Sequence, residues 1–319
     1  MVKPLLTIEN LRVSFPTHTG RVEVVKGLSF TLGRERLGIV GESGSGKSMT
    51  GRSILKLIRK PGEVTADTLE FDGIDILSQS EKQMRAIRGA RISMVMQDPK
   101  FSLNPVMTVG EQIAEALVTH QKLPRRDVQA RIIEMLHAVR INDPERVAKL
   151  YPHEVSGGMG QRIMIAMMLI PEPELLIADE PTSALDVSVQ AQVLNLMSDL
   201  KEEFGLTYLF ISHDLTVVEH MADRIGVLYL GRLVEEAPHD VLFEQPKHPY
   251  TRMLFEAAPK LDGFGREIAP PKGEIPDPIN PPSGCAYHPR CPLAATRCTR
   301  ERPEMRQLGN RRIACHLAE

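Results

Sequence analysis

A glycine-rich loop at Gly41–Ser48 constrains the fold of this 319-residue chain more than any other feature. It matches the pattern G-x-x-x-x-G-K-[ST] in full and follows Leu37–Val40, an apolar run typical of a buried parallel strand. Apolar residues up to Ile58 then predict a helix that ends at Pro61. A strand, a glycine-rich turn and a helix N-terminus aim backbone N–H groups at a phosphate, which favours nucleotide binding over a merely flexible loop.

The loop also supplies a positive charge and a hydroxyl. Lys47 would neutralise the β- and γ-phosphates of a nucleotide, and the hydroxyl of Ser48 would ligate Mg²⁺. The residues of the loop that we expect to bind the nucleotide are Gly41, Ser43, Gly44, Ser45, Gly46, Lys47 and Ser48.

A second apolar run, Leu175–Ala178, ends in two adjacent carboxylates, Asp179 and Glu180. Asp179 would hold Mg²⁺ through water, and Glu180 is placed to polarise the attacking water as a general base. An ordinary buried strand that ends in solvated acids would look the same. The run Pro181–Asp186, which follows directly, favours the functional interpretation.

Leu206–Ile211 predicts another buried strand, and it delivers His213 at its C-terminal end. Open α/β sheets place ligand chemistry at the carboxyl ends of their strands. A lone histidine is more often a surface or core residue. Its place at a strand end favours a role beside the nucleotide.

Ser156-Gly157-Gly158 predicts the start of a helix that ends before Pro171. Ser156 is a good N-cap residue, and apolar residues follow at helical spacing. The two glycines allow a close approach of backbone to a ligand, and a helix N-terminus attracts anions. The helix could equally be an N-capped core helix. One helix can also bind a ligand at its N-terminus while its apolar face packs in the core.

Three further segments complete a resemblance to a known family. Gln97-Asp98-Pro99 follows an apolar run, Pro181–Asp186 follows the acidic pair, and Phe15 ends an alternating strand before the loop. Together with Ser156-Gly157-Gly158, these motifs resemble the nucleotide-binding subunit of an ABC transporter. The tail that begins at His248-Pro249-Tyr250 resembles that of dipeptide and oligopeptide permeases, and the likeness covers nearly the whole chain.

The resemblance implies roles for particular residues. Gln97 would reach Mg²⁺ and the attacking water, and His213 would contact the γ-phosphate. Phe15 would stack on adenine, although it could also be a core residue of an antiparallel sheet. Asp186 would lie in the loop that crosses the subunit interface. The residues that would serve the ATP held by the opposite subunit are Ser156, Gly157 and Gly158.

The resemblance implies an α/β P-loop fold of the ABC type, with a mixed sheet core, an antiparallel β subdomain and a helical subdomain at about 91–165. Residues 1–255 would form the ATPase domain and 256–319 a tail rich in proline and cysteine. The chain departs from the family pattern at Met159, where glutamine is usual, and at Gly160, where arginine is common. We expect a working but weakened motif there.

The family also implies partners. These are a second, similar ATPase that meets this one head to tail, two transmembrane permease subunits and an external substrate-binding protein, at the cytoplasmic face of a bacterial inner membrane. The solute could instead be nickel, an oligosaccharide or an opine-like compound. A soluble ABC protein of DNA repair would need long heptad repeats, and a translation-associated one would need two ATPase cassettes; neither is present in the sequence.

Composition limits the remaining classes. The net charge of −2 gives no general attraction to nucleic acid or anionic lipid, so no nucleic-acid partner is expected. No apolar stretch approaches the roughly 18 residues that span a bilayer. The N-terminus has no long apolar signal core. Membrane association is therefore expected through a partner.

The tail differs in composition from the rest of the chain. Ten of the 24 prolines and all four cysteines follow Ala258, which predicts an extended segment that wraps around a folded body without a core of its own. Four thiolates in such a segment could hold a 4Fe–4S cluster, with His288 and His316 as reserve ligands. Zinc sites usually show a short C-x₂-C pair, which is missing here, and unliganded thiols are a further alternative. The four candidate ligands are Cys285, Cys291, Cys298 and Cys315.

Overall fold

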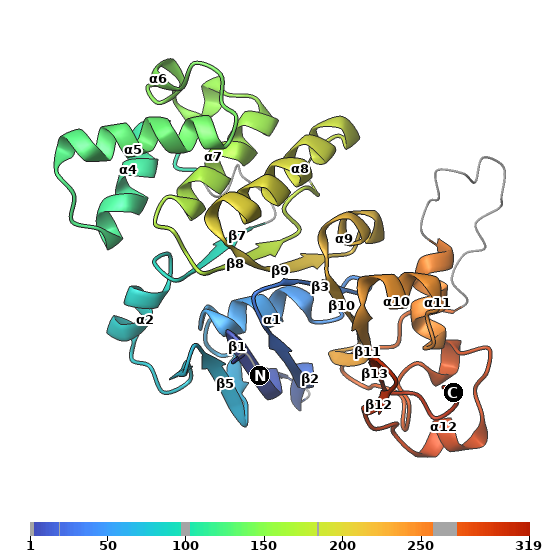
Figure 1. Ribbon diagram of the computed structural model, residues 1–319. Coiled ribbons are helices and arrows are strands. Elements are labelled where there is room, and N and C mark those ends of the chain that lie inside the picture. The colour runs from blue at the N-terminus through green and yellow to red at the C-terminus, as the bar shows by residue number, and fades with distance from the viewer. Residues whose placement is uncertain (1–2, 19, 97–102, 184, 258–272) are drawn as a thin grey trace. The chain divides into compact units, whose positions relative to one another are not determined.

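The computed structural model describes residues 3–18, 20–96, 103–183, 185–257 and 273–319 (Figure 1). The chain forms two compact units. The first contains residues 1–78 and 210–319, and the second contains residues 79–209. The predicted ATPase domain boundary near residue 255 stays a prediction.

An antiparallel sheet forms the N-terminal part of the first unit. Its order is β2-β1-β5-β6, and β4 pairs separately with β1. Alternate residues of β1 are buried, which is the pattern of a strand with one face on a core. The strands are β1 (Leu6–Thr17), β2 (Gly20–Leu32), β4 (Glu63–Thr65), β5 (Thr68–Phe71) and β6 (Ile74–Asp75).

A second sheet of the first unit has the order β12-β13-β11-β10-β3. β3 and β10 run parallel, whereas β10 and β11 form an antiparallel hairpin with Gly231 in its turn. The strands are β3 (Arg36–Val40), β10 (Arg224–Tyr229), β11 (Arg232–Pro238), β12 (Arg306–Leu308) and β13 (Arg311–Ile313). The helices of this unit are α1 (Lys47–Ile54), α9 (Leu215–Met221), α10 (His239–Glu244), α11 (Pro249–Ala257) and α12 (Thr296–Arg300), with a 3₁₀ turn η2 (His288–Arg290).

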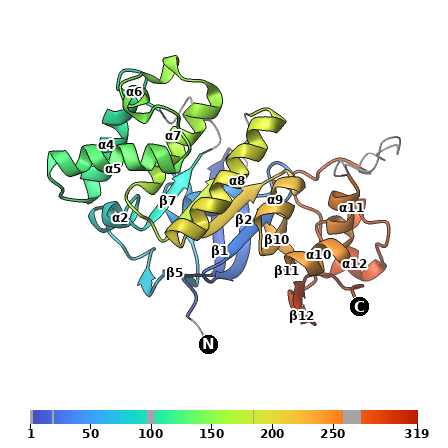
Figure 2. The same ribbon diagram turned by 45° about the horizontal axis from the view of Figure 1, so that its top comes forward.

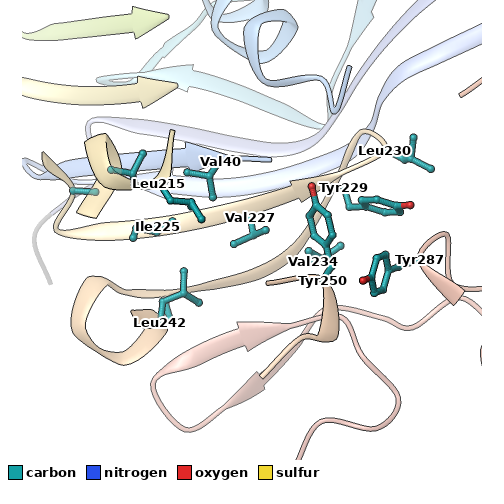
Figure 3. Close-up of a cluster of buried hydrophobic side chains, with 13 residues drawn as sticks. Val40, Leu215, Ile225, Val227, Tyr229, Leu230, Val234, Leu242, Tyr250 and Tyr287 are labelled. Carbon is teal, nitrogen blue, oxygen red and sulfur yellow. The ribbon is translucent and has the colours of Figure 1, made fainter. Parts of the chain in front are cut away.

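The tail packs onto the first unit, as the sequence predicts. Its β13 pairs with β11, and the side chain of Tyr287 is buried in the same hydrophobic cluster as Tyr229 of β10 and Tyr250 of α11 (Figure 3). The tail therefore shares the core of this unit.

The second unit is rich in helices. β7 (Ile92–Val95) and β8 (Leu175–Asp179) pair in parallel, and β9 (Thr207–Ser212) lies at the boundary of the two units. The helices α4, α5 and α7 lie side by side (Figures 1 and 2). The helices are α2 (Glu81–Ile87), α4 (Val109–His120), α5 (Arg125–Ala138), α6 (Pro144–Val147), α7 (Gly157–Leu169) and α8 (Val187–Phe204), with a 3₁₀ turn η1 (Pro152–Glu154).

The helix after the phosphate loop is shorter than its apolar residues predict. α1 ends at Ile54, and Lys56 has a φ of 49°, which breaks the helix before Ile58. The Nζ of Lys56 donates to the carbonyl of Leu77 at 3.0 Å, so a tertiary contact accompanies the early end. The predicted continuation of the helix beyond Ile54, through Ile58 to Pro61, was wrong.

Membrane spanning is a separate question. Within the part of the chain that the structure describes, no helix has the length and apolar character that crossing a bilayer requires.

Candidate functional site

The phosphate loop connects β3 to α1, in the arrangement that the sequence predicts. Gly46 adopts a left-handed conformation, with a φ of 98°, just before the helix begins at Lys47. A Cβ on Gly46 would lie 2.8 Å from the carbonyl oxygen of Val24, and one on Gly41 would lie 2.2 Å from that of Leu228. Both positions therefore require glycine.

The side chains of the loop fit a bound triphosphate. Lys47 is buried, and its Nζ donates to the carbonyl oxygens of Gly41 at 2.7 Å and Glu42 at 3.0 Å. These carbonyls hold the ammonium at the loop, where phosphate oxygens can compete for it. The hydroxyl of Ser45 is buried and has no hydrogen-bond partner among the described residues. Ser48, on the first turn of α1, is half-buried.

Neighbouring strands hold the loop in place. The N–H of Gly231, in the turn between β10 and β11, donates to the carbonyl of Ser45 at 3.0 Å. The N–H of Glu42 donates to the hydroxyl of Tyr250 at 2.9 Å, and the carboxylate of Glu42 pairs with Arg290. No sequence motif indicated the contacts of Tyr250 and Arg290, because both residues are far from the loop along the chain.

Phe15 and His213 also belong to the first unit. Phe15 is half-buried on β1, and its ring packs so closely on Gly62 that a Cβ there would lie 2.5 Å from Cε1. His213 follows the last residue of β9 and is exposed. The hydroxyl of Ser212 accepts the N–H of Asp214 at 2.9 Å, and Asp214 in turn caps α9. The backbone on either side of His213 is thereby fixed.

The acidic pair lies in the second unit. All five residues of β8 are buried, and Asp179 ends the strand with 4% of its surface exposed. Glu180 adopts a φ of +50°, a conformation that costs energy for a residue other than glycine and is concentrated at functional sites. Its carbonyl accepts the N–H of Ser183 at 3.3 Å and the hydroxyl of Ser183 at 3.2 Å.

The start of α7 has the predicted cap. The hydroxyl oxygen of Ser156 accepts the N–H of Met159 at 3.3 Å, and Ser156 and Gly157 are exposed. Gly158 faces α8: a Cβ on it would lie 2.8 Å from Cγ1 of Val189. Gly158 therefore permits the close packing of α7 on α8.

The segment after the acidic pair is tied to both helices. The side chain of Gln161, on α7, donates to the carbonyl of Pro181. Asp186 caps α8, and its Oδ1 accepts the hydroxyl of Ser188 at 2.7 Å and the N–H of Val189 at 3.0 Å. These bonds lower the pKa of Asp186, and the bond from Ser188 has the largest effect. Within the second unit, the acidic pair and the start of α7 thus share a hydrogen-bonded framework.

The predicted site residues fall into two groups. The first unit contains Gly41–Ser48, Phe15 and His213, and the second contains Asp179, Glu180, the Ser156-Gly157-Gly158 turn and Asp186. Gln97, predicted to reach Mg²⁺, lies outside the described residues. The assigned roles of these residues stay predictions.

The four cysteines of the tail converge on one small cavity. All four are free thiols; Cys298 is buried and the others are half-buried. Burial raises the pKa of Cys285 and of Cys291, and the neighbouring thiols add to the rise. Among the described residues, no three Cys, His, Asp or Glu side chains are spaced to hold a metal ion. The cavity is lined by His248, Pro249, Cys285, Tyr287, His288, Cys291, Cys298, Cys315, His316 and Leu317.

Comparisons with known proteins agree with this geometry. The family model described as ABC transporter matches residues 25–183, and that of the oligopeptide/dipeptide transporter C-terminal region matches residues 234–298. The dipeptide transport ATP-binding protein DppD of Bacillus subtilis is 45% identical over 95% of this chain and 91% of its own length. The oligopeptide transport ATP-binding protein OppD of the same organism is 46% identical over 90% of this chain and 81% of its own length.

Solved structures support the same fold. The dimeric structure of MJ0796, a bacterial ABC transporter cassette, has a TM-score of 0.64 at 27% identity and covers 73% of this chain and 98% of its own. The cbiO1 structure from Clostridium perfringens, part of an ABC transporter complex, has a TM-score of 0.66 at 26% identity and covers 76% of this chain and 92% of its own.

The chain belongs to the ATP-binding proteins of ABC transporters, in the branch of the dipeptide and oligopeptide transport proteins. It is an ATPase that binds ATP with Mg²⁺, and the predicted α/β P-loop fold of the ABC type is confirmed.

Proposed function

We propose that this chain hydrolyses ATP to power the import of dipeptides or oligopeptides. The observation that carries the proposal is the identity of 42% to 46% with peptide transport ATP-binding proteins over 90% or more of the chain, including its tail. The tail matters because the match at residues 234–298 is to the peptide transporter C-terminal region, whereas the ATP motifs are common to the whole superfamily.

The proposed assembly lies at the cytoplasmic face of a bacterial inner membrane. It contains this chain, a second and similar ATPase, two transmembrane permease subunits and an external substrate-binding protein. Relatives named as transport ATP-binding proteins support the permease partners, and the dimeric cassette structures support the pair of ATPases.

For the hydrolysis step, we assign the general base to Glu180. It would take the proton of a water whose oxygen attacks the γ-phosphorus; the bond from that phosphorus to the β–γ bridging oxygen breaks, and ADP leaves with its electron pair. Lys47 would neutralise charge on the phosphates, and His213 and Gln97 would keep the water in line. Ser48, Gln97 and Asp179 would hold Mg²⁺, which would neutralise further charge on the phosphates.

We further propose that each ATP is bound between two ATPase subunits. The phosphate loop offers one set of backbone donors, and the exposed start of α7 at Ser156 and Gly157 offers a second. The second set would bind the γ-phosphate of the ATP on the opposite subunit, with Asp186 at the interface. A Glu180→Gln variant should then dimerise with ATP and hydrolyse it very slowly. Glu203→Gln, an exposed carboxylate on α8, is the matched control.

The tail, residues 256–319, is proposed to hold a 4Fe–4S cluster on Cys285, Cys291, Cys298 and Cys315. Four thiols lining one cavity are the donor set that such a cluster uses, although they are not preset at metal-binding spacing among the described residues. When bound, the cluster would cross-link the four cysteines and so stabilise the extended segment that contains them. Structural zinc and unliganded thiols are the competing outcomes.

Two experiments test these proposals. The chain is purified with its membrane and periplasmic partners, and peptides are compared with nickel and oligosaccharides for stimulation of ATPase activity. Stimulation by peptides supports import of peptides, and stimulation by another solute alone contradicts it.

The cluster is tested after anaerobic purification by an ultraviolet–visible spectrum with iron and sulfide analysis. A Cys298→Ser variant should lose the cluster's visible absorption, together with its iron and sulfide. Material without iron would contradict the cluster.

A further inference from the structure

An ion pair joins the tail directly to the phosphate loop. Nη1 and Nη2 of Arg290 donate to Oε2 and Oε1 of Glu42 at 2.7 and 2.9 Å. Glu42 is the second residue of the phosphate loop, and Arg290 ends the 3₁₀ turn η2, immediately before Cys291. Such bidentate pairs fix both distance and orientation.

The arginine of this pair is itself held firmly. Only 3% of its side chain is exposed, compared with 20% of that of Glu42. Its guanidinium lies over the rings of Tyr229 and Tyr287, 5.9 and 5.8 Å from their centres. The bond to Glu42 raises the pKa of Arg290, so the charge persists despite burial.

A second contact holds the backbone of the same loop residue. The N–H of Glu42 donates to the hydroxyl of Tyr250 at 2.9 Å. The side chain of Tyr250 is fully buried, with its ring 4.5 Å from that of Tyr229 and 5.3 Å from that of Tyr287 (Figure 3). Residues after the ATPase motifs therefore hold both the main chain and the side chain of Glu42.

Glu42 also contacts Lys47, the lysine expected to bind phosphate. The carbonyl of Glu42 accepts from the Nζ of Lys47 at 3.0 Å, so a displacement of Glu42 also displaces Lys47. Without Arg290, the carboxylate of Glu42 would be an unpaired negative charge beside the place of the triphosphate. It would repel phosphate and compete for Lys47.

We propose that Arg290 and Tyr250 are positioning residues for ATP binding: they hold Glu42 so that the phosphate loop is preformed, and Arg290 neutralises the carboxylate of Glu42. The tail thus supports the nucleotide site through Glu42 without touching the nucleotide itself. The proposal depends on ATP binding at the loop and not on the transported solute or on a metal in the tail.

The test measures the Kd and KM for MgATP and the kcat in Arg290→Gln. A preformed loop binds ground state and transition state alike, so we expect Kd and KM to rise about tenfold and kcat to change less than about threefold. The matched control is Arg297→Gln, an exposed arginine of the same tail that pairs with Glu301, and it should leave all three constants unchanged.

A variant that removes both charges distinguishes the positioning role of Arg290 from a purely structural role of its side chain in packing. In the Arg290→Gln, Glu42→Gln double variant the two amides can still hydrogen-bond and hold position 42, and no unpaired carboxylate remains, so most of the lost MgATP affinity should return. Tyr250→Phe removes only the hydroxyl, and it should weaken MgATP binding about threefold without lowering kcat. Tyr250→Phe also tests the proposal if the Arg290→Gln protein fails to fold.

Two results would overturn the proposal. One is unchanged MgATP affinity in a folded Arg290→Gln protein, or in Tyr250→Phe if Arg290→Gln does not fold. The other is a double variant that binds MgATP as weakly as Arg290→Gln. Because nucleotide binding is measured without peptide, neither result bears on the proposed solute.

Discussion

A buried carboxylate on β11 allows a quantitative test of how the tail is anchored. Glu235 is fully buried, and its Oε1 accepts from Arg311 of β13 at 2.9 Å and from the N–H of Lys247 at 3.0 Å. Its Oε2 accepts the N–H of His248 at 2.9 Å. One side chain therefore fastens a tail strand and the segment that leads into α11.

The cost of Glu235→Gln follows from these contacts. The amide keeps one acceptor oxygen, but its NH₂ group faces a donor, and Arg311, with 7% of its side chain exposed, loses its charge partner. Removing one partner of a buried pair typically costs 3–5 kcal/mol, so we expect about 3 kcal/mol from the variant. In a unit of this size that loss corresponds to a fall of about 10 °C in Tm.

Urea unfolding followed by circular dichroism measures this loss, since the chain has no tryptophan. The control is Glu70→Gln, whose partner Lys3 is 65% exposed; it should cost less than about 0.5 kcal/mol. A cost below about 1 kcal/mol for Glu235→Gln would refute the anchoring role.

Two further variants test local geometry. Gly41→Ala places a Cβ 2.2 Å from the carbonyl of Leu228, so MgATP affinity measured by titration should fall more than about tenfold; wild-type affinity would contradict the crowding argument. Ser156→Ala removes the cap of α7 and should lower the free energy of unfolding by about 1 kcal/mol, as judged by urea titration against an exposed Glu203→Ala control; equal stability would show that the cap contributes nothing.

Local sequence patterns predicted the individual elements of the site well. The glycines of the phosphate loop, the apolar run of β8 and the cap at Ser156 each depend on residues close together in the chain, and short-range physics determines their conformation. Their order along the chain then identified the family, which the comparisons confirm.

Long-range contacts could not be predicted in this way. Arg290 and Glu42 are 248 positions apart, and neither residue type indicates a partner at that distance. The early end of α1 was also missed: Lys56 adopts a φ of 49°, and its side chain makes a tertiary contact with the carbonyl of Leu77. The presence of four cysteines in one proline-rich segment identified them as candidate ligands, but the chain must fold before they share a cavity.

ATP-driven uptake of a labelled dipeptide by vesicles that contain the purified transport complex tests the account most directly. We predict accumulation that requires ATP and is abolished by Lys47→Gln, because the phosphates then lack their positive partner in the loop. Dipeptide accumulation that continues in the Lys47→Gln complex, or a wild-type complex that accumulates no peptide, would contradict the account.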